Sequence, residues 1–279
     1  MLAIALLATL GNMQLYASRN LDFSTNLEEV ALMEPVKQQS NRFFSYALEI
    51  ASRESIFYYT DATTVDLGPV LGAGYDATFF AGPVLIKARG FAQKSWINYI
   101  TNHAGTFPFV AQSIFEASIF PGLRFVLPNG GDVQIYAGLD MTKMIQDTQE
   151  VYSDEEIGGL YKCQDRMFAT VGARLHAYPF FKNSSRHTVG ATVELSKLLS
   201  GKMEIIGIES HYNSGLRCQL AAQVNRKLAS GSLFFKPFFR CESLGKSSGG
   251  NTKPGLAIPY DRKEENLQLF SGVELGVAF

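Results

Sequence analysis

Apolar residues recur at every second position along most of the chain from about residue 41 onward. In 133–141 the odd positions are apolar, beginning with Val133 and Ile135, while the even positions include Gln134 and Asp140. A period of two places the apolar residues on one face of an extended strand. The pattern therefore predicts an all-β protein whose strands each have one apolar and one polar face.

Short polar or glycine-containing segments separate the alternating stretches. These segments are 128–131, 199–202, 213–215 and 229–231. The first contains Asn129-Gly130, and this pair readily adopts the positive φ angles that a tight hairpin turn requires. The spacing therefore predicts consecutive antiparallel hairpins.

The predicted strands are long. Their approximate ranges are 42–51, 66–75, 80–91, 96–104, 114–127, 131–143, 166–178, 187–198, 203–212, 215–226, 231–242 and 266–279. A tilted strand needs roughly 9–11 residues to cross a bilayer, whereas strands of globular proteins have about 5–6. We therefore expect a membrane-spanning antiparallel up-and-down β-barrel of about 12 strands, within a range of about 10–14, rather than a soluble sandwich.

Two long polar stretches, 144–165 and 243–265, resemble the external loops that such barrels carry on one side of the membrane. The predicted strand order places these two stretches on opposite sides. Either the predicted strands between these two stretches are one too few or one too many, or 144–165 is a periplasmic or lumenal insertion.

The N-terminal part precedes the alternation. The apolar run Met1–Leu10 is shorter than the roughly 20 residues of a membrane-spanning helix. With the small Ala17 at its end, 1–17 is predicted to be a signal peptide, and a buried helix is the alternative. Residues 18–40 are predicted to be a periplasmic or plug segment, which leaves 41–279 for the barrel.

Composition adds few constraints. A net charge of −1 gives no electrostatic reason to expect nucleic-acid binding. The three cysteines and the histidines lack the spacing of metal ligands, so neither a metal nor another cofactor is expected. Cys218 and Cys241 could face each other across a hairpin, where a disulfide requires a suitable Cβ separation.

The last strand has the same alternation and ends in an aromatic residue. Its outward positions include Val273, Leu275, Val277 and Phe279, and Gly272 lies on the opposite face. This segment resembles the C-terminal signal of bacterial outer-membrane β-barrels, which the barrel-assembly machinery recognises. The resemblance implies that these five residues act as an assembly signal. It also implies that the chain resides in the outer membrane, with the lipid bilayer and the assembly machinery as partners.

If the apolar face meets lipid, the polar face lines the interior. The charged residues expected there are Lys87, Arg89, Glu116, Arg124, Asp140, Arg174, Glu194, Arg217, Lys236, Arg240, Glu242 and Glu274. Both signs are interspersed, which suits either a water-filled pore or a set of salt bridges that closes the barrel. Since barrels of more than about eight strands tend to leave interior space, we expect a pore.

The sequence therefore predicts a porin-like passive channel for small polar solutes, without enzymatic activity. A structural or adhesin barrel without an open pore is the main alternative, and oligomerisation stays open. A third reading comes from His211, Ser214 and Asn225, which faintly resemble the catalytic residues of outer-membrane phospholipase A. In that family the His and Ser share one strand face, whereas Ser214 follows His211 by three positions in a predicted turn.

Overall fold

The computed structural model describes residues 44–61, 64–101, 105–128, 131–147, 161–177, 187–205, 208–248 and 265–279. The predicted signal peptide and the predicted segment 18–40 lie outside the described residues. No helix among the described residues is long and apolar enough to span a bilayer.

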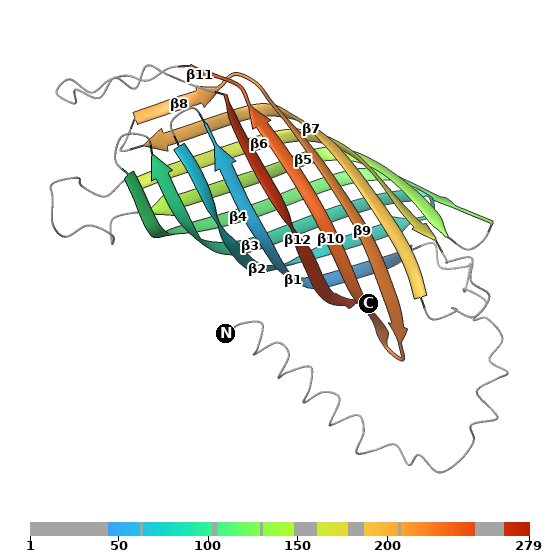
Figure 1. Cartoon of the computed structure of the whole chain (residues 1–279). Coiled ribbons are helices and arrows are strands. Elements are labelled where there is room, and N and C mark those ends of the chain that lie inside the picture. The colour runs from blue at the N-terminus through green and yellow to red at the C-terminus, as the bar shows by residue number, and fades with distance from the viewer. Residues whose placement is uncertain are drawn as a thin grey trace, which may run out of the picture. The chain divides into compact units, whose positions relative to one another are not determined.

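Ten strands form a closed antiparallel barrel (Figure 1). They are β1 (Phe44–Thr60), β2 (Thr64–Ala81), β3 (Val84–Thr101), β4 (Gly105–Val126), β5 (Asp132–Asp147), β6 (Tyr161–Ala177), β7 (His187–Ile205), β9 (Gly215–Leu228), β10 (Gly231–Leu244) and β12 (Asn266–Ala278). Each strand pairs with its neighbours in the chain, and pairing of β12 with β1 closes the ring. The predicted up-and-down barrel is confirmed, with ten strands in the closed ring instead of twelve.

Among the described residues, two short strands lie outside the ring. Strand β8 (Ile208–Tyr212) pairs with the last residues of β7, and β11 (Ser247–Ser248) pairs with β8. The predicted turn at 199–202 is wrong, because β7 continues through it. A bulge between β6 and β7 accommodates Leu199, since Phe168 pairs with Leu198 and Met167 with Ser200. A bulge carries small and turn-forming residues just as a turn does, so local composition alone could not separate the two.

A second difference from the predicted strand number lies near the start of the barrel. The predicted strand 80–91 spans the real turn at Gly82-Pro83, where Gly82 has a φ of 59°. The predicted break between 91 and 96 does not exist, because β3 is continuous there. With ten strands, β5 and β10 run in the same direction, so the segments that follow them leave from the same end of the barrel. The conflict between the two long polar stretches is thereby removed.

The outer surface of the barrel is apolar over a band of each strand. Large exposed side chains such as Ile135, Leu139 and Val171 occupy it. The first outward-facing charges after this band along β3, β5 and β7 are Lys94, Lys143 and Lys197. A charge at the bilayer midplane is costly, so these lysines mark the outer edge of the lipid-facing band. Strand β3 continues for seven more residues to Thr101, and the barrel wall therefore rises beyond the membrane.

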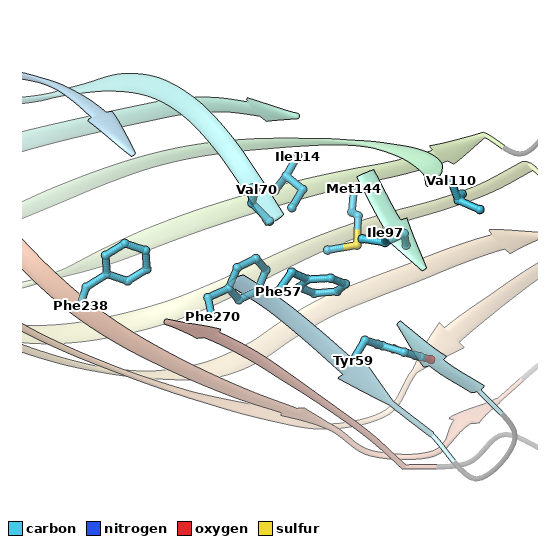
Figure 2. Packing of buried hydrophobic residues seen from close by; sticks show 9 residues of the cluster. All are labelled: Phe57, Tyr59, Val70, Ile97, Val110, Ile114, Met144, Phe238 and Phe270. Carbon is cyan, nitrogen blue, oxygen red and sulfur yellow. The ribbon is translucent and has the colours of Figure 1, made fainter. Parts of the chain in front are cut away.

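The inside of the barrel contains an apolar cluster toward the end at which β1 finishes (Figure 2). Its buried members are Phe57, Tyr59, Val70, Ile97, Val110, Ile114, Met144, Phe238 and Phe270. Phe57 and Phe270 come from adjacent strands, and their ring centroids lie 4.9 Å apart. Apolar side chains thus occupy part of an interior for which the alternation predicts polar residues.

Candidate functional site

The twelve charged residues predicted for the interior all lie on the inward faces of their strands. Eleven of them are buried, and Arg124 is half-buried with a side chain that is 24% exposed. Water lining a pore would leave such side chains accessible. Instead, the structure brings most of them together in ion pairs, and two clusters stand out.

The first cluster surrounds Glu116 on β4. Its two carboxylate oxygens accept hydrogen bonds from Arg53 Nη1 at 2.9 Å and Arg240 Nη1 at 2.6 Å. Arg53 also donates to Glu274 at 2.6 Å, and Lys236 Nζ lies 2.9 Å from Glu274. The Arg53 guanidinium stacks 3.6 Å from the centroid of the Phe91 ring. Five charges from four strands thus form one buried network.

The second cluster surrounds Arg89 on β3. Its guanidinium lies 3.1 Å from Glu194 and 2.9 Å from Asp140, two carboxylates on different strands. Arg217 approaches the same Asp140 oxygen at 2.8 Å, and the Tyr136 hydroxyl donates to Glu194 at 2.8 Å. Every charge in this cluster therefore has a partner of opposite sign.

The remaining pairs include residues that the sequence prediction missed. Arg166 pairs with Glu242, and Arg174 pairs with Glu49. The pair of Lys87 Nζ with Asp76 spans 2.9 Å. The residues of the interior network that the prediction missed include Glu49, Arg53, Asp76 and Arg166. Arg53 was missed because the predicted strand ended at residue 51, although the inward series of odd positions continues through it.

Together these pairs fill the barrel at the level of the lipid-facing band. Buried ion pairs are tolerated when each charge is partnered and hydrogen-bonded, as it is for Arg53, Arg89 and Glu116. The apolar cluster of Phe57 and its neighbours lies above this layer. The arrangement can hold opposite walls of the barrel together, because several bridges join strands that are not neighbours in the ring. These bridges include Arg89 to Glu194, Arg174 to Glu49 and Arg240 to Glu116.

The structure does not bring together His211 and Asn225, two of the residues that resemble the catalytic residues of outer-membrane phospholipase A. His211 lies on β8, exposed, and pairs in register with Lys202. Asn225 faces the interior, where its amide donates to the Thr188 hydroxyl at 2.9 Å. Since Lys202 and Thr188 lie fourteen positions apart on β7, His211 and Asn225 are at opposite ends of the wall. Next to His211, a hydrogen bond from Lys202 at 2.6 Å lowers the pKa of Glu209.

The predicted assembly-signal residues lie in the strand that closes the barrel. Val273, Leu275, Val277 and Phe279 occupy outward positions of β12 and its end, and Gly272 faces inward. The backbone groups of Phe279 and Leu48 exchange hydrogen bonds at 2.9 and 3.2 Å. A Cβ on Gly272 would lie 2.1 Å from the Glu54 carbonyl oxygen, so this position requires glycine.

Cys218 on β9 and Cys241 on β10 are direct partners in register and are both free thiols. Directly opposed residues have Cα separations of about 4.5–5.5 Å, within the range that a disulfide spans. Mild oxidation of the refolded protein should therefore join these two cysteines and leave Cys163 as a thiol. Intact mass after alkylation should show one modified thiol per chain. Three modified thiols, or cross-linked dimers through Cys218, would contradict this register.

No family model and no curated protein sequence matches this chain. Among solved structures, the outer membrane protease OmpT from Escherichia coli matches 84% of this chain and 96% of its own, with a TM-score of 0.54 and 11% identity. The match to the translocator domain of the autotransporter NalP from Neisseria meningitidis covers 98% of this chain and 96% of that domain, with a TM-score of 0.42 and 11% identity. The match to Neisserial surface protein A covers 83% of this chain and 97% of that protein, with a TM-score of 0.31 and 12% identity.

The closed barrel with its apolar outer band defines the class: this chain is a bacterial outer-membrane β-barrel. At 11% identity the likeness to OmpT shows the fold alone. The expected location in the bacterial outer membrane is confirmed, and no particular family within the class is identified.

Proposed function

We propose that this chain is a structural outer-membrane barrel without an open pore, whose wall presents a contact surface outside the cell. The observation that carries the proposal is the buried ion-pair network centred on Glu116 and Arg89. A polar lumen can conduct only where water has continuous access to it. Side chains such as Lys87 and Glu274 are 2% exposed, so the membrane level of the barrel is filled.

The contact surface follows from strand length. Strand β4 has 22 residues, about twice the roughly 9–11 that cross a bilayer. The wall beyond Lys94 and Lys143 therefore stands in water on the side where β1 ends. Charged outward residues, among them Asp165, Lys202 and Glu209, are grouped on this part of the wall. Such a rim suits adhesion or contact with other molecules at the cell surface.

A porin-like channel for small polar solutes is the second candidate. The interspersed charges on the inward face favour it, because a mixed-charge wall suits passage of polar molecules. Opening would require the bridges of Glu116 to separate, since these join β4 to β1 and β10 across the interior. The assembly machinery and the lipid bilayer are the partners that we propose for either function.

Single-channel recording separates the two candidates. Refolded protein in planar bilayers should give no discrete conductance steps, because the buried ion pairs leave no continuous path for water at the level of the membrane. A variant with Arg53→Ala, Glu116→Ala and Arg240→Ala removes three large side chains of one network and should introduce steps. Discrete, repeated steps from the unmodified protein would overturn the closed barrel in favour of the channel.

A further inference from the structure

A cavity of about 130 Å³ lies inside the barrel at the end where β1 begins. It is lined by inward side chains from β1, β2, β4, β5 and β6. Glu49, Asp76, Asp132 and Gln134 are buried residues of this lining, and His176 completes one side. Its polar lining differs from the apolar cluster at the other end of the barrel.

The cations near this cavity already have partners. Arg174 pairs with one oxygen of Glu49, and Lys87 Nζ lies 2.9 Å from Asp76 Oδ2. On the opposite side, Arg124 Nη2 donates to Asp132 Oδ2 at 3.1 Å. The Gln134 amide donates to the second Asp132 oxygen at 2.9 Å. These contacts hold the lining side chains in place, but some of their polar atoms remain without a hydrogen-bond partner.

The atoms left over are mostly acceptors. Within the described part of the chain, the buried lining atoms without a hydrogen-bond partner include the acceptors Glu49 Oε2, Asp76 Oδ1 and Gln134 Oε1, against one donor, Arg124 Nε. His176 Nε2 is also without a partner, and it donates or accepts according to the tautomer of the ring. A buried acceptor without a partner is costly, because it has lost its hydrogen bonds to water. An occupant that supplies several donors would satisfy these atoms together.

We propose that the cavity binds a small solute with several hydrogen-bond donors, namely a primary ammonium ion. Such a group carries three N–H donors, and its charge strengthens hydrogen bonds to the carboxylates of Glu49 and Asp76. A metal ion fits less well: the described residues include no group of three His, Cys, Asp or Glu side chains placed to hold one. The site lies at one mouth of the barrel, so this binding is independent of whether the interior conducts.

The imidazole of His176 reports on occupancy, because its unpartnered Nε2 lines the cavity. Methylammonium chloride is titrated into refolded protein labelled with 15N histidine, at constant ionic strength. The Nε2 resonance of His176 should shift and saturate, while that of His187, outside the cavity lining, should not. Tetramethylammonium is the matched probe, since it carries the same charge without a donor, and it should produce no saturable shift.

A matched variant tests the lining itself. Gln134→Leu removes one free acceptor together with the hydrogen bond that the amide donates to Asp132, and it leaves the ion pairs of Glu49 and Asp76 in place. Loss of one charge-assisted hydrogen bond should weaken methylammonium binding about tenfold. Absence of a saturable shift with methylammonium, or equal shifts with both cations, would overturn the proposal. The two-cation comparison on the unmodified protein decides even if the variant does not refold.

Discussion

Replacement of Glu116 by Gln should destabilise the barrel by about 3–5 kcal/mol, the cost of removing one partner from a buried ion pair. Glu116 lies between Arg53 and Arg240, at 2.9 and 2.6 Å. Without its charge, the two arginines face each other in a space from which water is excluded. Trp96, the single tryptophan, can follow urea unfolding of the refolded protein in lipid vesicles by fluorescence.

The matched control is Asp165→Asn on the outer wall. Asp165 pairs with Lys143 at 3.5 Å, and both side chains are about half-exposed. Exposed pairs contribute about 0–1 kcal/mol because water screens them. If Glu116→Gln and Asp165→Asn cost the same small amount, the interior pair is screened as well. That result would mean a water-filled lumen and would favour the channel.

The architecture could be predicted from the sequence because one physical rule generates it. Lipid on one side and packed polar groups on the other force alternation in every strand, and residues 133–141 show it. Strand ends were predicted less well. Gly201 and Ser200 look like a turn but occupy a bulged part of β7, where pairing with β6 continues on both sides. Pairing partners distant in the sequence decide such cases.

The interior was predicted only in part for a related reason. Alternation identifies which residues face inward, so Lys87, Arg89 and Glu116 were found. It does not show which of them meet across the barrel, because Arg53 and Glu116 lie 63 positions apart. Whether the interior is a pore or closed depends on these contacts across the barrel. It also depends on inward apolar residues such as Phe57 and Ile114, which break the simple polar pattern.

Placement of a charge on the outer band should be as informative as its removal from the interior. Val171 on β6 faces outward, is 58% exposed and pairs in register with Ala137 and Leu195. If this surface meets the hydrocarbon core, Val171→Arg should cost about 2–4 kcal/mol. The same urea unfolding measurement in vesicles gives the value.

Ile100→Arg provides the position control. Ile100 also faces outward and is 41% exposed, but it lies six residues beyond Lys94 along β3. Near or above the interface, an arginine costs about 0–1 kcal/mol. A large difference between the two variants therefore measures the edge of the membrane on this barrel. If both variants lower the free energy of unfolding by the same small amount, the outer band meets water. Lys94, Lys143 and Lys197 would then not mark the edge of the lipid.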